Sequence, residues 1–138
     1  HGVKLKLDLR LPPKTFVTGR SERLGQVVRN LIDNAVSFSP EGGIVTVAAW
    51  ADFGRVSIAV EDEGPGIPPE NLETIFRRFY TSRPPEQGFG NNSGLGLSIA
   101  RQIVNGHGGR IWAENREHGG ARFVVELPEA LPEDPEAS

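Results

Sequence analysis

Residues 21–40, SERLGQVVRNLIDNAVSFSP, decide the fold because they carry two patterns at helical spacing. Apolar residues recur three and four positions apart, which predicts a helix with one side in the core. These apolar residues are Leu24, Val27, Val28, Leu31, Ile32 and Ala35. Asn30, Asn34 and Ser37 have the same spacing. At about 100° per residue they form a polar row beside the apolar stripe.

A polar row next to a core needs hydrogen-bond partners. An asparagine side chain has a carbonyl acceptor and two N–H donors, and a buried polar group left unpaired costs about 1–3 kcal/mol. One interpretation is that a polar ligand binds against Asn30 and Asn34. The other, equally open at this point, is that both amides bond only to backbone or water.

Length and composition limit the class of protein. The 138 residues have the size of one domain with a single core. There is no cysteine, which excludes disulfides and thiolate metal sites and fits a reducing compartment. No apolar run is long enough to span a bilayer and no signal peptide is recognisable, so we expect a soluble chain.

The formal net charge of −3 comes from the C-terminal end, since residues 126–138 hold five acidic residues and no basic one. No basic stripe alternates with aromatic residues, so nucleic-acid binding is not supported. The three lysines, at positions 4, 6 and 14, exclude a GxxxxGK[ST] phosphate loop, and HRD and DFG kinase motifs are absent. Phosphate chemistry here must use backbone amides, arginines and a metal ion.

The chain alternates between strand and helix patterns. Strands are predicted over 3–9, 15–18, 44–50, 55–61, 109–113 and 121–127, and helices over 21–39, 69–80 and 95–106. The alternation in 3–9 indicates a half-buried strand, and 44–50 with 55–61 an antiparallel hairpin. Ser21 is a suitable N-cap for the first helix. Residues 128–138 lack apolar content and are predicted to be disordered.

Two glycine-containing loops are candidate ligand sites. In DEGPGIP, residues 62–68, Gly64 and Gly66 allow a tight turn and close approach of a ligand, and Asp62 can accept a hydrogen bond from an amino group. The alternative is a plain turn after a strand. Residues 81–93 are rich in turn formers and indicate a lid or a surface linker. They end at residues 94–96, GLG, which open a helix where backbone amides can bind an anion.

In order, these stretches resemble the catalytic ATP-binding domain of sensor histidine kinases, in the superfamily shared with DNA gyrase B, heat-shock-ninety chaperones and mismatch-repair ATPases. NLIDNA at 30–35 resembles the asparagine box, 62–66 the first glycine box, IFRRFY at 75–80 the phenylalanine box and GLGL at 94–97 the second glycine box. HGGRIW at 107–112 is also similar. The resemblance covers about residues 3–128, and the lid resembles alphaproteobacterial stimulus-sensing kinases.

The resemblance implies an α+β fold, the two-layer α/β sandwich known as the Bergerat fold. Its mixed, mostly antiparallel sheet of about five strands packs on three helices, and a flexible ATP lid covers the nucleotide. The catalytic ATP-binding domain would span residues 1–128, with the lid over about 80–93 and an acidic, proline-rich tail at 129–138.

The resemblance also implies the site. Asp62 would take the adenine amino group, the amides around Leu95 and Gly96 the phosphates, and Asn30 and Asn34 both Mg²⁺ and phosphates. The full set of implied nucleotide-binding residues is Asn30, Asn34, Phe38, Asp62, Gly64, Gly66, Ile67, Gly94, Leu95, Gly96 and Leu97, with Phe38, Ile67 and Leu97 bordering the adenine ring.

Asn30 separates kinase from hydrolase within the superfamily. Gyrase-like members have a glutamate at this position, which acts as general base on water, whereas an amide cannot accept a proton at neutral pH. Phosphoryl transfer needs mainly positioning and charge neutralisation, so it tolerates Asn30 when the acceptor is a histidine held in line.

Two positions depart from the family pattern. The family often has a lysine where Ser37 stands and an arginine where Thr81 stands. We expect Arg83, or else Arg78, to supply the charge near the γ-phosphate, which makes Arg83 a candidate catalytic residue together with Asn30.

None of the histidines, His1, His107 and His118, lies in a phosphoacceptor pattern. The acceptor would therefore lie on a dimerising helical domain outside this chain, and the phosphate would pass on to a response regulator. The resemblance implies a cytoplasmic domain of a sensor in the bacterial inner membrane. Alternatives are a non-catalytic binding module that no longer binds nucleotide, and a serine or anti-sigma kinase of the same superfamily.

Overall fold

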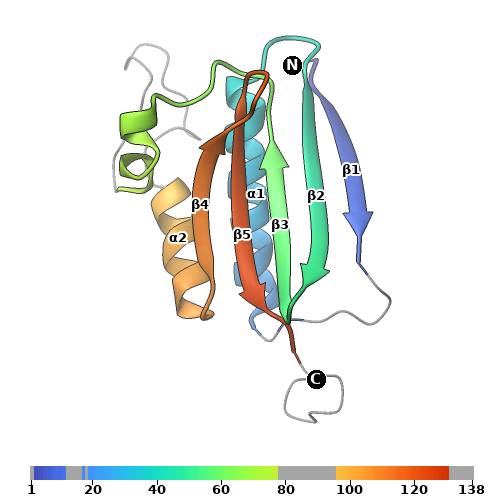
Figure 1. Cartoon of the computed structure of the whole chain (residues 1–138), viewed down its shortest axis with the longest axis vertical. Helices are drawn as coiled ribbons and strands as arrows, with labels where there is room; N and C mark the ends of the chain where they lie inside the picture. Colours follow the sequence, from blue (N-terminus) through green and yellow to red (C-terminus); the bar gives the residue numbers. More distant parts are fainter. Residues whose placement is uncertain (1, 12–16, 18, 78–95, 131–138) are drawn as a thin grey trace.

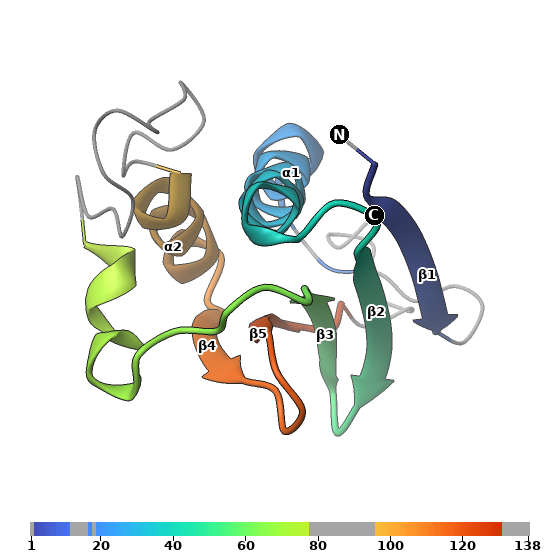
Figure 2. The same ribbon diagram turned by 90° about the horizontal axis from the view of Figure 1, so that it is seen from above.

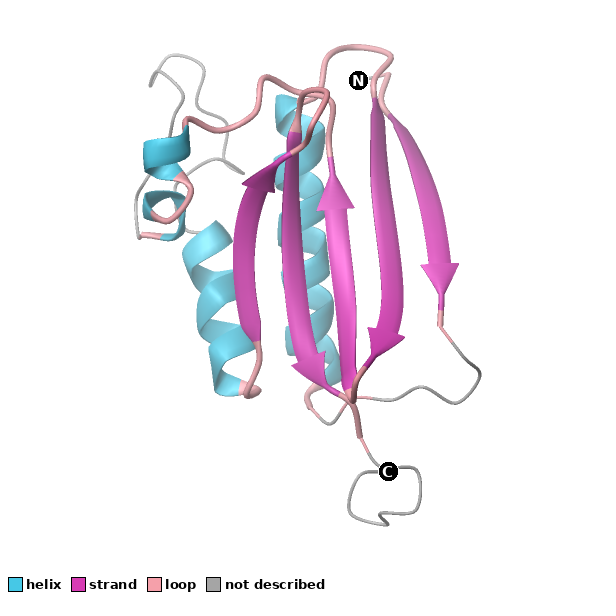
Figure 3. Ribbon diagram, viewed as in Figure 1, coloured by secondary structure: helices cyan, strands magenta, loops and turns pink. Residues whose placement is uncertain are grey.

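The computed structural model describes residues 2–11, 17, 19–77 and 96–130. They form two layers, a five-stranded sheet with both α-helices on one of its faces (Figures 1, 2 and 3). The elements in chain order are β1 (Lys4–Arg10), α1 (Ser21–Phe38), β2 (Ile44–Asp52), β3 (Arg55–Glu61), the 3-10 helices η1 (Pro69–Asn71) and η2 (Thr74–Phe76), α2 (Gly96–Gly106), β4 (Arg110–Asn115) and β5 (Ala121–Pro128).

The sheet has the strand order β1-β2-β3-β5-β4. β1 pairs with β2 in parallel, and the other three pairings are antiparallel. The predicted hairpin of β2 and β3 is confirmed, and it turns through Phe53 and Gly54, whose φ angles are 52° and 75°. The prediction of a mixed, mostly antiparallel sheet of five strands is also confirmed.

α1 is the predicted amphipathic helix. Val27, Leu31 and Ala35 face the sheet with exposed fractions of 2%, 0% and 0%. Its start differs from the prediction, because Ser21 is already helical and the N-cap is Arg20 in an extended conformation without a side-chain cap bond. The backbone carbonyl of Arg20 accepts the Leu24 N–H at 2.9 Å. The N-cap position is therefore occupied by Arg20 and not by the predicted Ser21.

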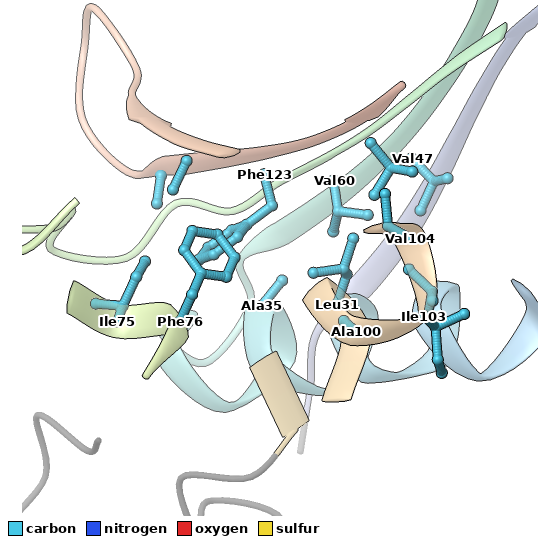
Figure 4. Packing of buried hydrophobic residues seen from close by; sticks show 14 of the residues in the cluster. Leu31, Ala35, Val47, Val60, Ile75, Phe76, Ala100, Ile103, Val104 and Phe123 are labelled. Atoms are coloured by element: carbon cyan, nitrogen blue, oxygen red, sulfur yellow. The ribbon is translucent and has the colours of Figure 1, made fainter. Parts of the chain in front are cut away.

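The core lies between the helices and the sheet (Figure 4). Leu31, Val60 and Val104, from α1, β3 and α2, are fully buried at its centre. Phe76 of η2 meets Phe123 of β5 edge to face, with ring centroids 6.0 Å apart and planes at 75°. Each such side chain gains about 1.5–3 kcal/mol from burial, so the core holds the elements that carry the site.

The predicted continuous helix over 69–80 is wrong in its described part. The chain forms two 3-10 turns there, η1 and η2, so the described residues contain two α-helices and not the three expected. The Thr74 hydroxyl donates to the Asn71 carbonyl at 3.3 Å, a local bond that competes with regular helix. The insertion of Ile75 and Phe76 into the core gives these turns their tertiary support. Phe79 and Tyr80 lie outside the described residues.

The leucines of β1 are exposed and not half-buried as their alternation predicted. Leu5, Leu7 and Leu9 have exposed fractions of 54%, 61% and 62%. The register pairs Leu5 with Val45, which is buried, so both side chains lie on the helix-bearing face. α1 contacts β2 and β3, and no described helix lies over β1 (Figure 2). Burial at this edge depends on coverage and not on strand periodicity alone.

Several predictions concern the ends of the described segments. Of the strand predicted over 15–18, only Val17 is described, and it forms an isolated antiparallel bridge with Glu129. The Glu129 N–H also donates to Gly54 O at 2.9 Å, so the first residue of the predicted tail is tied to the sheet. Residues 131–138 lie outside the described part, and the boundary at 128 stays a prediction. In the described ranges, neither α-helix has the length and apolar character that crossing a bilayer requires.

Candidate functional site

Four segments form the candidate site, three of them at one end of the sandwich and one, the start of α2, lower down beside α1 (Figure 1). They are the C-terminal half of α1, the loop after β3, the start of α2 and the turn between β4 and β5. Hydrogen bonds connect α1 to α2, and the loop after β3 to the β4–β5 turn. The sequence predicted the first three segments as parts of a site, and did not predict the fourth.

The polar row of α1 faces the start of α2. Asn30 Nδ2 donates to the Gly96 carbonyl at 3.1 Å, across the gap between the two helices. The Ser37 hydroxyl donates to the Asn34 carbonyl at 2.8 Å, and all three residues of the row are partly buried. The structure therefore gives Asn30 a protein partner at the predicted second glycine box.

Asp62 is a buried carboxylate at the end of β3, with an exposed fraction of 2%. Its Oδ1 accepts the Gly64 N–H at 2.9 Å and the Ala121 N–H at 3.1 Å. Burial raises the pKa of Asp62 above its ordinary value, while these two donors and the nearby Arg116 guanidinium oppose that rise. Because Oδ1 takes both backbone bonds, Oδ2 is the oxygen left to accept from a ligand.

The two glycines after Asp62 serve the tight turn that the sequence predicted. A Cβ at Gly64 would lie 2.6 Å from the carbonyl oxygen of Phe38, so the loop passes directly against the end of α1. Gly66 has a φ of 82°, in the left-handed region where other residues are strained. This close approach brings Asp62 next to the helix that carries the polar row.

The three residues predicted to border the adenine ring lie in the described part of the chain. Ile67 and Leu97 are partly buried and pack against the core cluster, and Phe38 is partly buried in the last turn of α1. Gly96 is the first residue of α2, and a Cβ there would lie 4.0 Å from Cγ of Asn30. These side chains come from the same segments as the polar groups.

Other predicted site residues lie outside the described part of the chain. They are Gly94 and Leu95 of the second glycine box and the candidate catalytic Arg83, with its alternative Arg78 and the predicted lid over 80–93. Their roles stay predictions, and the anion site at the start of α2 is described only from Gly96 onward.

Asn115 and Arg116, at the end of β4, are site residues that the sequence analysis missed. Asn115 bonds to the backbone of Ile67, 48 positions away, and Arg116 to the backbone of Asp62, 54 positions away. Neither residue belongs to a recognisable spacing pattern. Only the glycine pair Gly119 and Gly120 in the following turn indicated a close approach of the backbone.

The side-chain oxygens of the polar row on α1 are of the kind that hard metal ions prefer. No group of three or more His, Cys, Asp or Glu side chains that could hold a metal occurs among the residues the structure describes. A metal ion here would instead be held by the amide oxygens of Asn30 and Asn34, together with oxygens of a ligand. Oxygen donors and a partly ligand-made coordination shell suit Mg²⁺.

The sequence is similar to known proteins over most of its length. Residues 19–131 match the family described as histidine kinase-, DNA gyrase B-, and HSP90-like ATPase. The sensor protein ChvG of Agrobacterium fabrum is 52% identical over 120 residues, which cover 83% of this chain and 20% of ChvG. The chain thus spans about a fifth of the length of this relative.

Solved structures share the fold. The full-length protein ShkA in complex with AMPPNP superposes with a TM-score of 0.80 at 30% identity, covering 97% of this chain and 27% of ShkA. Histidine kinase ThkA in complex with response regulator protein TrrA has a TM-score of 0.73 at 33% identity, covering 91% of this chain and 34% of ThkA. The α+β sandwich predicted from the sequence is confirmed.

Proposed function

The chain belongs to the family of histidine kinase-, DNA gyrase B- and HSP90-like ATPases, and from this premise we propose that it is the catalytic domain of a two-component sensor histidine kinase. In this role it binds Mg·ATP and transfers the γ-phosphate to a histidine outside this chain. The observation that carries the proposal is Asp62, a buried carboxylate whose Oδ1 is held by two backbone donors at the rim of a polar site. Sensor-kinase relatives that match most of this chain support it.

Asp62 recognises the adenine base. Its remaining oxygen, Oδ2, accepts a hydrogen bond from the exocyclic amino group, a contact that a base without this group cannot make. Ile67, Leu97 and Phe38 border the ring and exclude water from its faces. Gly64 and Gly66 let the backbone approach the base. The low exposure of Asp62 supports this role, because hydrogen bonds are stronger where water is excluded.

Asn30 and Asn34 bind the phosphate end of the nucleotide. Their side-chain oxygens hold Mg²⁺, which neutralises phosphate charge when bound. The backbone N–H groups at Gly94, Leu95 and Gly96 bind the phosphates at the positive end of α2. The bond from Asn30 to Gly96 O supports this assignment, since it joins the two parts of the phosphate site.

Transfer to a protein histidine is favoured over hydrolysis, because Asn30 cannot act as a general base on water. The acceptor lies outside the described residues of this chain. His107 is occupied structurally, since its Nδ1 lies 2.8 Å from Ile103 O and its Nε2 accepts the Arg20 N–H at 3.2 Å. His118 is exposed in the β4–β5 turn, away from any helix.

The partners follow from this chemistry. A dimerising helical domain of the parent protein carries the acceptor histidine, and a response regulator takes the phosphate from it. The complex of ThkA with TrrA supports the second partner. We further assign residues 1–128 to the catalytic domain, about 80–93 to the lid and 129–138 to a tail. We place the domain in the cytoplasmic part of an inner-membrane sensor, and the relative ChvG is named as a sensor protein.

Calorimetric titration with a non-hydrolysable ATP analogue tests the binding site. We expect Asp62→Ala to weaken binding about 100-fold, and Asn34→Ala or removal of Mg²⁺ to weaken it about tenfold each. Without Mg²⁺, the Asn34→Ala change should add little, because both remove the same interaction. Asn105→Ala, an exposed asparagine of α2, is the matched control. No binding by the folded, unmodified chain would favour the non-catalytic binding module.

A transfer assay with the helical domain of a relative tests the reaction. We expect an acid-labile phosphohistidine on that domain, little ATP turnover by the chain alone, and reduced transfer by Arg83→Ala. A phosphate stable to acid would identify the serine-kinase alternative. Rapid hydrolysis by the chain alone would contradict the role given to Asn30, and unchanged transfer by Arg83→Ala would remove that arginine from the site.

A further inference from the structure

The loop of residues 62–67 is tied at its far end by a side chain of β4. Asn115 Oδ1 accepts the Ile67 N–H at 2.7 Å, and Asn115 Nδ2 donates to the Ile67 carbonyl at 2.7 Å. One amide thus pairs with both backbone groups of a single residue, as a neighbouring strand would. Two bonds at once fix the position and the orientation of Ile67.

The near end of the same loop is tied by the next residue of the chain. Arg116 Nη1 donates to the carbonyl of Asp62 at 2.7 Å. The Asp62 N–H donates to Ala121 O at 3.0 Å, and the Ala121 N–H returns a bond to Asp62 Oδ1 at 3.1 Å. The backbone of Asp62 is therefore held by Arg116 and Ala121, and its carboxylate is oriented by the backbone N–H groups of Ala121 and Gly64.

The turn itself has a shape that allows both contacts. The Arg116 N–H donates to Gly120 O at 2.9 Å and closes the turn. Gly120 has a φ of 92°, and a Cβ there would collide with the carbonyl oxygen of Asp62. The backbones of turn and loop touch directly, so consecutive side chains of one turn reach both ends of the loop.

We propose that Asn115 and Arg116 are positioning residues for adenine-nucleotide binding, with Arg116 setting Asp62 against the amino group of the base and Asn115 setting Ile67 against its ring. The inference rests on the proposed function, because that function assigns Asp62 and Ile67 to the base. Neither side chain needs to touch the nucleotide. Each acts by holding a contact residue within the small displacement that productive binding tolerates.

The two residues have separable effects on base selectivity. Inosine diphosphate (IDP) has an oxygen where adenosine diphosphate (ADP) has the amino group, so only ADP benefits from a well-placed Asp62. Displacing Asp62 lowers the preference for ADP. Displacing Ile67 weakens the contact with the ring, which both nucleotides share, and leaves the preference unchanged. A purely structural role predicts neither pattern in protein that stays folded.

Calorimetric titration of the whole chain with ADP and with IDP, in Mg²⁺ and below the melting temperature of each variant, tests the proposal. We expect Arg116→Ala to weaken ADP binding about tenfold and IDP binding less than about twofold. Asn115→Ala should weaken both about fivefold, with the ADP to IDP ratio kept. Asn115→Asp keeps an acceptor for the Ile67 N–H but has no donor for its carbonyl, and should fall between Asn115→Ala and wild type.

Matched controls and a second readout cover the case of variants that fold poorly. Arg23→Ala on α1 and Asn105→Ala on α2 remove exposed side chains of the same types and should bind like wild type. Hydrogen exchange of the Ile67 amide in Asn115→Ala, which removes the acceptor of this N–H, is measured without nucleotide and should be faster than in wild type.

The outcomes separate the two levels of the proposal. If folded wild type binds ADP but Arg116→Ala keeps its ADP to IDP ratio, or Asn115→Ala keeps both affinities, the positioning role is wrong while the proposed function stands. An Ile67 amide that exchanges no faster in Asn115→Ala would also overturn it. If folded wild type binds neither nucleotide, the proposed function fails, and this inference fails with it.

Discussion

The two ends of α1 are held by different kinds of contact. At its C-terminal end, the loop of residues 62–67 buries a carboxylate and is tied to the β4–β5 turn by side-chain and backbone bonds. At its N-terminal end, the ring of His107 joins the helices: it accepts the Arg20 N–H and, with its proton on Nδ1, donates to Ile103 O.

This difference shows which end serves binding and which serves stability. Burying the Asp62 carboxylate is unfavourable, as its raised pKa indicates, and no nearby bond fully offsets this cost. The His107 contacts join two helices through an uncharged tautomer of the ring. Changes at the C-terminal end should therefore alter nucleotide binding, whereas changes at the N-terminal end should alter the free energy of unfolding alone.

The largest effect is expected from Gly120→Ala, at the C-terminal end. The new Cβ would collide with the Asp62 carbonyl oxygen and would strain a residue at φ 92°. We expect a loss of about 3 kcal/mol in unfolding free energy, together with weaker ADP binding. The control is Gly119→Ala, which has a φ of 109° but no atom within 4 Å of its Cβ, so it carries the strain without the collision. Equal losses in urea titrations of both variants would mean that the close contact is unimportant.

At the N-terminal end, His107→Ala should cost about 1–2 kcal/mol, since it removes the acceptor for the Arg20 N–H and the bond to Ile103 O. ADP affinity of the folded protein should not change, which distinguishes this end from the other. His118→Ala, an exposed histidine of the β4–β5 turn, is the control. A change in ADP affinity for His107→Ala, measured by titration calorimetry, would show that the two ends of α1 are coupled.

A smaller effect is expected in the pH dependence of stability. Because burial raises the pKa of Asp62, the folded protein holds this proton more tightly than the unfolded chain does. The resulting stabilisation is complete below the unfolded value of 3.8 and is lost as pH rises through the folded pKa.

Asp62→Asn keeps an oxygen for both backbone donors and carries no charge. The variant therefore does not lose stability as pH rises in the way that wild type does. Its unfolding free energy relative to wild type should therefore increase from acidic to neutral pH in urea titrations. Asp33→Asn, on the exposed side of α1, is the control. A difference between Asp62→Asn and wild type that shrinks with rising pH would mean that the folded pKa is lowered and that the carboxylate stabilises the fold.

The sequence predicted those features that local patterns determine. The stripe of α1, the hairpin of β2 and β3 and the tight turn at Gly64 and Gly66 were correct because each depends on residues close together in the chain. The predicted regular helix was wrong over residues 69–77, its described part, since a Thr74 bond to Asn71 and the insertion of Phe76 into the core favour 3-10 turns.

Features that depend on distant residues were not predictable in this way. The exposure of Leu7 depends on whether a helix lies over β1, and the strand pattern contains no information about that. Asn115 and Arg116 reach the site only because the sheet order places β5 beside β3 and β4 on the other side of β5. Their side chains follow no spacing rule, and their partners are backbone groups that look alike in any sequence.

The smallest effect is expected beside the N-terminal half of α1, where the described residues leave an apolar hollow of about 330 Å³ against the sheet. It is lined by Val17, Gly19, Leu24, Gly25, Val27, Val28, Ile58, Val125 and Leu127.

Ile58→Phe adds apolar volume from a partly buried position on β3 and should stabilise the protein by about 0.5–1 kcal/mol, because it fills space next to existing core contacts. ADP affinity should stay at the wild-type value, since the hollow lies away from Asp62. Ile44→Phe, at a position that is 38% exposed on β2, is the control and should gain little. Destabilisation by Ile58→Phe in urea titrations would show that the hollow is not free to accept a larger side chain, and weaker ADP binding would show that packing under the first turns of α1 reaches the nucleotide end.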